Sequence, residues 1–314
     1  MESTDLLDRF CLREDLHQSF GYKKLMEKIG WSSIFVSGSY LSVRQLGPVS
    51  LAKIQRPKVI DLPKLTALRK KLSMVHLIVE PGAAITLVPL TGKKLQLNLL
   101  EQSDLARCAQ KLQEAGLRVS NEHYAHSKTM ILDVQAPMQE FLLSLPQKTR
   151  YNIKQALKAD VTYTTTEFSK LEESDCTEFF SLHKRWSKER KILGFSQHFL
   201  TSIFEVFPGN GYLIRARVND DLVGAMIVLI HSGVGYYYYT CTIQPGFKYQ
   251  IPSGLTYHAI AISKERGADI FDFCSVYDER YPQVTPRWKG FSEFKSRFNP
   301  VSVYYPPTFS RWIL

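Results

Sequence analysis

Lysine and arginine side chains gather in four stretches of the chain, and such clusters are suited to binding anions. The first stretch, residues 53–71, holds seven basic residues against one acidic residue. The second contains Arg150, Lys154 and Lys158, whose spacing of four places them in one stripe along a helix, with Ile153 and Leu157 expected on the core side. The others lie at residues 184–191 and 287–297. An RNA backbone or a pyrophosphate suits such a surface, although solvated helix faces are the simpler explanation of any single stretch.

Four consecutive tyrosines, residues 236–239, form the densest aromatic run of the chain. On a regular strand Tyr236 and Tyr238 face one side, and Tyr237 and Tyr239 face the other. One pair can then pack in the core while the other lines a cleft and contacts a sugar or a peptide. The high strand propensity of tyrosine is the alternative explanation of the run.

Several kinds of reactive site are excluded by the absence of their motifs. The eight histidines are dispersed, and the only close pair, His123 and His126, lacks further ligands beyond Glu122, so we expect no metal site. The sequence has no GxxxxGK[ST], GxGxxG or GxSxG motif. Five scattered cysteines without a CxxC pair indicate reduced thiols.

Composition points to an ordinary globular protein with a basic surface. The 314 residues are 44% hydrophobic and carry a formal charge of +10, which favours a polyanionic partner such as nucleic acid, anionic lipid or a phosphorylated substrate. The beginning of the chain is acidic, unlike a secretory signal, and the longest apolar stretch, residues 222–230, is too short to span a bilayer. We therefore expect a cytoplasmic protein, with peripheral contact to the inner face of the membrane as an open alternative.

The second half of the chain has the clearest pattern of helices and strands. The expected order is a helix, three antiparallel strands joined by tight turns, a loop with the sequence QPGFKYQIPSG, a second helix and a further strand. These elements cover residues 173–191, 212–218, 222–230, 234–242, 255–266 and 270–276. This is the order of an N-acyltransferase lobe of the acetyltransferase type.

The first half alternates between helix and strand in a looser version of the same order. Helices are expected at residues 17–29, 63–72 and 103–115, and strands at residues 33–36, 40–45, 76–80 and 130–134. We therefore predict an α+β fold of two tandem acetyltransferase-like lobes, with mixed, mainly antiparallel central sheets and a cleft between them. The predicted lobes are residues 1–144 and residues 145–299.

Four segments together resemble the FemABX family of bacterial peptidoglycan aminoacyltransferases. They are residues 16–31, 46–51, 127–161 and 267–300. The most specific features are a strand ending in Leu132-Asp133 before the helix KTRYNIKQALKA, and the later motif GFSEFKSRF. The resemblance implies that residues 300–314 return to the first lobe. Because the second lobe has no sustained heptad run, the chain is similar to the shorter members of the family, which lack a helical arm.

The resemblance also implies a reaction, namely transfer of an amino acid of the Gly, Ala or Ser class from aminoacyl-tRNA to the side-chain amine of a peptidoglycan precursor stem peptide. This reaction builds an interpeptide bridge. An aminoacyl ester is already activated, so neither ATP nor a metal nor another cofactor is expected, and aminoacyl-tRNA is the co-substrate. The expected partners are the tRNA and a muropeptide precursor, either lipid-linked or UDP-linked.

Catalytic residues are carried over from the family's Phe-Lys motif. Lys295 would stabilise the negative charge that develops on the ester carbonyl oxygen, and Phe294 would place the backbone of the motif against the aminoacyl end. A lysine on an ordinary strand, with its stem packed and its ammonium in water, is the structural alternative for Lys295.

Substrate-binding residues follow less directly from the resemblance. Arg190 would bind a precursor phosphate, a task for which the planar guanidinium suits better than an ammonium. Tyr239 would line the precursor cleft, and Arg150, Lys154 and Lys289 complete the expected set, with a structural role for Arg150 left open. Related sequences often carry a lysine where this chain has Met26, which leaves the phosphate contacts of the precursor undecided.

Three other functions compete with this one. The same fold could use an acyl-CoA donor, although QPGFKYQIPSG has only two glycines, and its two prolines remove backbone donors that a pyrophosphate needs. The basic clusters alone would also fit a non-catalytic RNA-binding protein, which binds charged and uncharged tRNA alike. An inactive relative acting as a partner subunit is the third alternative.

Overall fold

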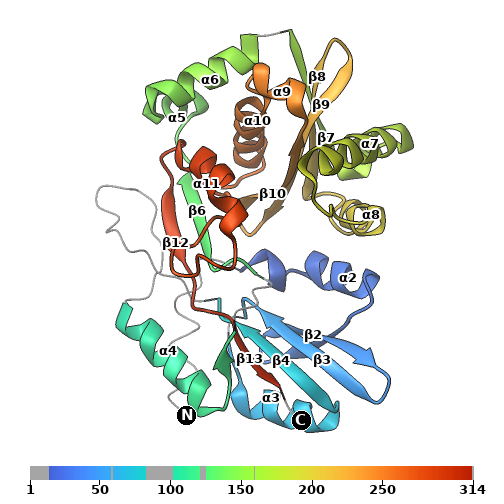
Figure 1. Ribbon diagram of the computed structural model, residues 1–314, viewed down its shortest axis with the longest axis vertical. Helices are drawn as coiled ribbons and strands as arrows, with labels where there is room; N and C mark the ends of the chain where they lie inside the picture. The colour runs from blue at the N-terminus through green and yellow to red at the C-terminus, as the bar shows by residue number, and fades with distance from the viewer. Residues whose placement is uncertain (1–13, 58, 83–101, 121–124, 159, 313–314) are drawn as a thin grey trace. The chain divides into compact units, whose positions relative to one another are not determined.

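Each half of the chain folds around its own β-sheet in the computed structural model, with helices packed against the sheet (Figure 1). The structure describes residues 14–57, 59–82, 102–120, 125–158 and 160–312. Two compact units result. Unit 1 consists of residues 1–130, 275–292 and 301–314, and unit 2 consists of residues 131–274 and 293–300. The predicted α+β fold with two mainly antiparallel sheets is confirmed.

Unit 1 is built on a six-stranded sheet with the order β1-β2-β3-β4-β13-β5. Its strands are β1 (Ser32–Val36), β2 (Ser39–Leu46), β3 (Val49–Gln55), β4 (Met74–Glu80), β13 (Phe309–Trp312) and β5 (Arg118–Val119). The expected hairpin forms at Ser37-Gly38, where both residues have positive φ. Only β3 and β4 run parallel, and helix α3 (Leu62–Lys71) connects them. The late strand β13 pairs with both β4 and β5.

The core of unit 1 lies between its sheet and its helices. Besides α3, these helices include α2 (Phe20–Lys28) and α4 (Gln102–Glu114), with a short 3₁₀ turn, η1 (Leu16–Gln18), before α2. Leu41, Ile54, Leu65 and Phe309 come from four different elements and are all buried in one cluster. Ser19 caps α2 and Asp61 caps α3, each by accepting a backbone N–H of the first turn.

The second sheet has seven strands in the order β12-β6-β11-β10-β9-β8-β7, and all of them except β12 and the first half of β6 belong to unit 2. The strands of this sheet are β12 (Val301–Tyr304), β6 (Lys128–Asp133), β11 (Ile270–Asp272), β10 (Val234–Thr242), β9 (Asp221–His231), β8 (Gly211–Val218) and β7 (Val161–Glu167). Strands β7 to β10 form the predicted antiparallel meander with one additional strand at its edge, and β10 pairs with β11 in parallel.

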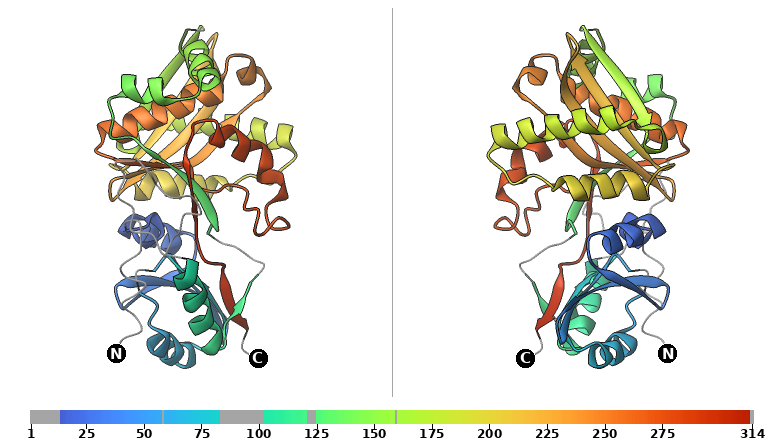
Figure 2. Two further views of the ribbon diagram at one scale, coloured as in Figure 1. Left: turned by 90° about the vertical axis from the view of Figure 1, so that its left-hand side faces the viewer. Right: turned by 90° about the vertical axis from the view of Figure 1, so that its right-hand side faces the viewer.

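Helices cover both faces of this sheet (Figure 2). Helices α6 (Gln147–Lys158) and α10 (Ile251–Glu265) pack on one face, and α7 (Glu173–Arg190) and α8 (Gln197–Val206) lie on the other (Figure 1). The remaining helical segments are α5 (Met138–Ser144), η2 (Phe168–Lys170), α9 (Gln244–Lys248), η3 (Pro286–Trp288) and α11 (Lys289–Ser296).

The units divide the chain at points that differ from the sequence-based boundary between residues 144 and 145. Residues 131–133 pair with β11, so the chain joins the second sheet before α5. Residues 275–292 belong to unit 1, since Arg280 donates hydrogen bonds to the backbone oxygens of Ser127 and Tyr305. Side-chain contacts between distant segments therefore set the division, and local sequence patterns do not report them.

Candidate active site

Helix α11 carries the two residues of the Phe-Lys motif and turns Lys295 toward the protein interior. Ser292, Lys295 and Phe298 are spaced by three residues and are all buried, so they form the inner side of this short helix and the turn after it. Lys295 is only 5% exposed. The alternative of a strand lysine with its ammonium in water is therefore wrong, because the residue is helical and its ammonium is enclosed.

The Lys295 ammonium lies beside Tyr237, within β10, and beside Phe273, which directly follows β11. Its Nζ donates a hydrogen bond to the backbone oxygen of Phe273 at 2.7 Å and lies 5.0 Å from the ring centroid of Tyr237. An aromatic face stabilises a cation in such a position. Burial lowers the pKa of Lys295 to about 8, although the nearby Cys274 and Asp272 act in the opposite direction. A lysine with this pKa is mostly protonated at neutral pH, yet it can lose and regain its proton more readily than a surface lysine.

A β-bulge divides the tyrosine run, so the predicted alternation of residues 236–239 is wrong. The pairing of β10 with β9 shifts between Tyr237 and Tyr239, which places Tyr238 as an extra residue in the strand. Tyr237 lies toward α10, where its hydroxyl interacts with Thr256, while Tyr239 lies toward α7. Tyr237 and Tyr239 therefore serve opposite faces of the sheet. Burial raises the pKa of both phenols, that of Tyr237 to about 12.

Tyr239 is held by a histidine of α7 that the sequence analysis did not single out. The Tyr239 hydroxyl lies 2.6 Å from Nδ1 of His183, and Nε2 of the same ring lies 3.0 Å from the backbone oxygen of Phe195. Because a carbonyl oxygen can only accept, Nε2 carries the proton and Nδ1 accepts the tyrosine hydrogen. Trp186, one helical turn after His183, packs edge-on against the Tyr239 ring. The signal in the sequence was the spacing of these two aromatic residues along the helix that faces β10.

The other predicted binding residues have separate surroundings. The Arg190 guanidinium lies 5.2 Å from the ring centroid of Phe247 in α9, and the Lys289 ammonium lies 4.9 Å from that of Tyr277. Arg150 donates hydrogen bonds to the backbone oxygens of Leu143 and Leu145, at the end of α5.

Arg190, Lys289 and Arg150 each have different neighbours, so their contacts do not place them in one shared pocket. The contacts of Arg150 are those of a residue that fixes the junction between two helices, while Lys154 is exposed on α6. The core side of α6 is formed by Ile153 and Ala156, whereas Leu157 is 41% exposed, so the expected core position of Leu157 is wrong. Phe294 is partly buried, and its ring contacts that of Phe298 edge-on.

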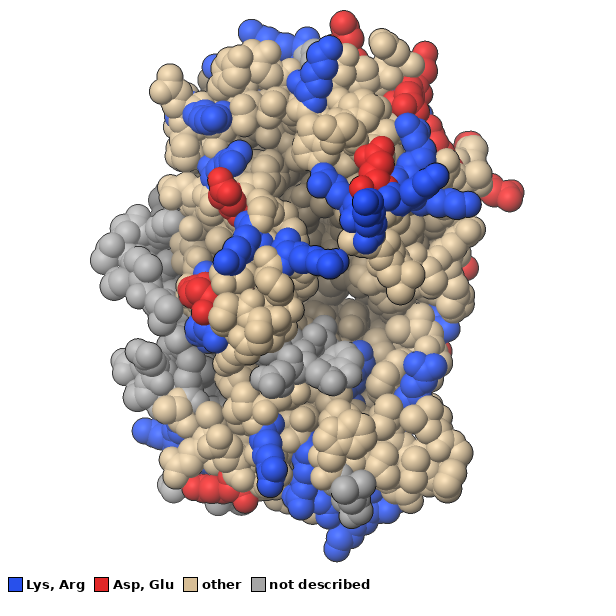
Figure 3. Space-filling view, in the orientation of Figure 1, with Lys and Arg blue, Asp and Glu red and all other residues tan. Residues whose placement is uncertain are grey.

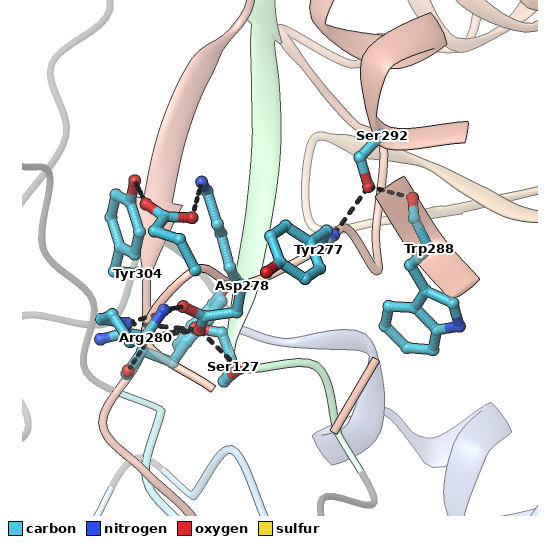
Figure 4. Close-up of polar contacts among 10 residues, drawn as sticks. Ser127, Tyr277, Asp278, Arg280, Trp288, Ser292 and Tyr304 are labelled. Atoms are coloured by element: carbon cyan, nitrogen blue, oxygen red, sulfur yellow. Dashed lines mark hydrogen bonds and ion pairs between the residues drawn. The ribbon is translucent and has the colours of Figure 1, made fainter. Parts of the chain in front are cut away.

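A polar cavity of about 190 Å³ lies in unit 1, beside the segment that connects β11 to α11. Figure 4 shows the network beside it, in which the buried Asp278 carboxylate accepts hydrogen bonds from Ser127 and Arg280. Burial alone would raise the pKa of Asp278, but these hydrogen bonds outweigh burial and hold the pKa below its usual value. Tyr281, Thr285 and Trp288 complete much of the wall.

A second ion pair stiffens the same segment. Glu279 accepts hydrogen bonds of 2.6 Å from both the Lys128 ammonium and the Tyr304 hydroxyl (Figure 4). Ser292 of α11 accepts a hydrogen bond from the backbone N–H of Tyr277 and donates one to the backbone oxygen of Trp288. The loop between β11 and α11 is therefore fastened at both ends. The sequence analysis missed this network, for which the only local signal was the run VYDERY.

The beginning of α10 is covered by side chains. The expected loop at residues 244–254 forms helix α9 and the first turn of α10. Ile251, Ser253 and Gly254 are all buried there, and a Cβ atom on Gly254 would lie 2.0 Å from the Tyr163 hydroxyl and 3.0 Å from Cβ of Ala156. Tyr163 and α6 thus pack closely against the side of the first turn of α10.

Other expected features concern metal sites and the membrane. His123 lies outside the described residues, and within the described ranges no three His, Cys, Asp or Glu residues are placed to hold a metal ion. The helices that the structure describes include none that is both long enough and apolar enough to cross a bilayer.

Comparison with known proteins agrees with this architecture. Residues 147–283 match the model of the acetyltransferase (GNAT) domain. A crystal structure of FemX superposes with a TM-score of 0.74 at 14% identity, covering 99% of this chain and 95% of that chain. The chain has a FemX-like fold. The resemblance that the sequence motifs indicated is therefore confirmed at the level of the fold, and the chain contains an acyltransferase domain of the GNAT type.

Two further solved structures superpose on most of this chain. L-PGS from Bacillus licheniformis has a TM-score of 0.59 at 11% identity, covering 92% of this chain and 86% of that chain. A tandem GNAT protein from the clavulanic acid biosynthesis pathway has a TM-score of 0.54 at 11% identity, covering 98% of this chain and 93% of that chain. No curated protein matches the sequence.

Proposed function

We propose that the protein is an aminoacyltransferase that moves an amino acid from aminoacyl-tRNA to the side-chain amine of a peptidoglycan precursor. The observation that supports this proposal is the enclosed Lys295 of the Phe-Lys motif, which lies beside Tyr237 and Phe273 in a FemX-like fold that extends over nearly the whole chain. The transferred amino acid belongs to the Gly, Ala or Ser class, and the product is an interpeptide bridge.

The proposed chemistry needs one cation and one mobile proton. The acceptor amine attacks the ester carbonyl carbon, a C–N bond forms, and negative charge develops on the carbonyl oxygen. The Lys295 ammonium stabilises that oxygen, as the preorganised donors of an oxyanion hole do. The C–O bond to the ribose then breaks, and the ribose oxygen gains the proton that the amine loses. Because the pKa of Lys295 is about 8, this lysine can donate a proton to the leaving oxygen and recover one from the amine.

The start of α10 supports an aminoacyl ester over an acyl-CoA donor. A pyrophosphate binds readily at an open helix N-terminus, where backbone N–H groups point toward it. Here Pro252 lacks an N–H group, and the Tyr163 hydroxyl lies against Gly254. An acyl-CoA donor would find one backbone N–H fewer at this helix start, whereas an aminoacyl ester carries no pyrophosphate.

Transfer assays with the purified full chain test the proposal. The protein is incubated with tRNA charged with glycine, alanine or serine, and with a UDP-linked or a lipid-linked muropeptide, and the acceptor is analysed by mass spectrometry. A parallel reaction contains acetyl-CoA in place of tRNA. We expect a mass increase of one amino-acid residue with charged tRNA and none with acetyl-CoA.

Amino-acid substitutions test whether Lys295 takes part in the reaction. Lys295→Ala should lower turnover by about 10²-fold or more, the usual cost of removing an oxyanion donor, while Lys170→Ala, at an exposed lysine of η2, should not. An acetyl product would assign the site to an acyl-CoA donor. Equal binding of charged and uncharged tRNA without any product would assign the basic surface to RNA binding alone. Lys295→Ala turnover within a few-fold of that of the natural protein would remove Lys295 from the mechanism.

A further inference from the structure

The turn between α7 and α8 presents apolar side chains to solvent. Leu193 is fully exposed, at 102%, and its neighbours Ile192 and Phe195 are 38% and 49% exposed. Phe247 of α9, which lies against Arg190, is 39% exposed. Single exposed apolar side chains are common on protein surfaces. Three of them in one turn, with a fourth on the adjoining α9, are typical of a surface that binds an apolar partner. We name these four residues the apolar tip.

The backbone holds the apolar tip in one conformation. Lys191 adopts the left-handed conformation that ends α7, and the N–H of Ile192 donates to the backbone oxygen of Ser187, as in a Schellman turn. Gly194 then packs so closely on α7 that a Cβ atom there would lie 2.5 Å from the His183 ring. The hydrogen bond from His183 to the oxygen of Phe195 closes the turn. Leu193 is thus pointed outward by a well-anchored loop.

Basic side chains surround the apolar tip. Figure 3 shows Lys and Arg side chains gathered over the region that α7 occupies in Figure 1. Besides Arg185, which pairs with Asp221, the end of α7 and the adjoining α9 carry five exposed basic residues and one carboxylate, Glu189, which accepts a hydrogen bond from the backbone N–H of Gln244. The basic residues are Lys184, Lys188, Arg190, Lys191 and Lys248. This surface is therefore positive around an apolar centre.

We propose that the apolar tip inserts into the interface of an anionic lipid bilayer, with the surrounding lysines on the headgroups. Apolar side chains ringed by lysine and arginine are the composition of protein segments that lie in a bilayer interface, where each cation near an anionic surface adds to binding. RNA is a poorer partner for Ile192 and Leu193, because nucleobases stack on aromatic rings and these two aliphatic side chains offer none.

The position of the tip connects it to the proposed reaction. The His183 ring forms hydrogen bonds both with the backbone oxygen of Phe195 in the tip and with the hydroxyl of Tyr239, a candidate residue of the acceptor site. A bilayer bound at the tip would present a lipid-linked muropeptide to unit 2, so we infer that the acceptor is the lipid-linked form. This last step rests on the proposed function, whereas bilayer binding by the tip does not.

Vesicle sedimentation of the full chain tests the tip without tRNA or precursor. Vesicles contain either phosphatidylcholine alone or phosphatidylcholine with phosphatidylglycerol. We expect binding to the anionic vesicles and little to the neutral ones. Leu193→Glu should weaken the partition coefficient about ten- to hundredfold, because it removes the burial of one leucine side chain. Leu143→Glu, at a 67% exposed leucine of α5 in the same unit, should leave it unchanged.

Charge reversal tests the basic ring. Lys188→Glu combined with Lys248→Glu should weaken anionic-vesicle binding about tenfold or more, while Lys158→Glu combined with Lys170→Glu should have a small effect. Equal binding of the natural protein and Leu193→Glu overturns the proposal, as does equal binding to neutral and anionic vesicles. A charge reversal that abolishes tRNA binding and spares vesicle binding would assign the surface to RNA.

The two proposals fail in different ways. Absence of vesicle binding with intact transfer to a precursor refutes the membrane contact and leaves the transfer reaction standing. Vesicle binding without any transfer refutes the reaction and leaves the contact. Faster transfer to the UDP-linked precursor than to the lipid-linked one in vesicles would refute the choice of acceptor alone.

Discussion

Replacing Lys295 by methionine should stabilise the folded protein while it removes the proposed catalytic cation. Methionine has a similar length and no charge, so the packing against Tyr237 and Phe273 can be kept. Burial lowers the pKa of Lys295 from 10.5 to about 8, and each unit corresponds to 1.36 kcal/mol. Holding this ammonium in the folded protein therefore costs about 3 kcal/mol at neutral pH. Loss of the hydrogen bond to Phe273 lowers the free energy of unfolding by about 1 kcal/mol. The net increase in the free energy of unfolding is therefore about 2 kcal/mol.

The pH dependence of this difference identifies its cause. Because the folded pKa lies below the unfolded one, the unfolded chain binds more protons between about pH 8 and pH 10.5. The free energy of unfolding of the natural protein should therefore rise across that window, whereas that of Lys295→Met should not rise for this reason. The advantage of the methionine variant is largest below pH 8 and shrinks toward pH 10.5.

Calorimetry of both proteins at pH 7 and pH 10 measures the effect, with Lys170→Met as a control for the removal of an exposed charge. We expect the unfolding temperature of Lys295→Met to exceed that of the natural protein by several degrees at pH 7, and the gap to narrow at pH 10. A lower unfolding temperature at pH 7, or a gap that does not change with pH, would refute the view of Lys295 as a destabilising buried cation. Turnover measured on the same samples separates stability from catalysis.

Three further predictions concern side chains near the candidate site. Tyr239→Phe leaves Nδ1 of His183 without its donor, so it should lower the unfolding free energy by about 1–2 kcal/mol in denaturant titrations; an unchanged midpoint would contradict the hydrogen bond. Asp278→Asn should cost about 3 kcal/mol at pH 7, and because the folded pKa of this carboxyl lies below 3.8, the cost should begin to shrink as the pH falls below about 4. A cost that stays the same between pH 4 and pH 2 would show a packing effect instead. Gly194→Ala would place a Cβ atom 2.4 Å from the Ser187 hydroxyl, and it should destabilise unit 2 by about 1–3 kcal/mol in calorimetry; a neutral result would mean that His183 can move.

Local sequence signals located part of the regular structure, whereas β3, α5, β7, α8 and β13 were not among the expected elements. The Ser37-Gly38 turn, the two turns of the meander at residues 219–221 and 231–233, and the glycine after the helix that ends at residue 265 all mark element ends, because each needs a backbone conformation with positive φ. Apolar periodicity then located the helices and strands between them.

Features that depend on distant residues were not visible in the sequence. The bulge at Tyr238 inserts one residue into β10, and nothing in four consecutive tyrosines indicates which of them is extra. Leu157 was expected in the core by its spacing from Ile153, yet the helix turns Ala156 inward instead, against α10. The motif residue Lys295 was found from the resemblance, whereas its burial beneath Tyr237 required the packed sheet.

The place of β13 in unit 1 has a consequence for synthesis in the cell. This strand fills the position between β4 and β5, and its Phe309 is fully buried in the first core. Because translation proceeds from the N-terminus, the first sheet keeps two unpaired edges while the whole of unit 2 emerges from the ribosome. We therefore expect the antiparallel meander β7 to β10 to form on the nascent chain before the first sheet closes, and we expect chaperones to protect the unpaired edges of β4 and β5.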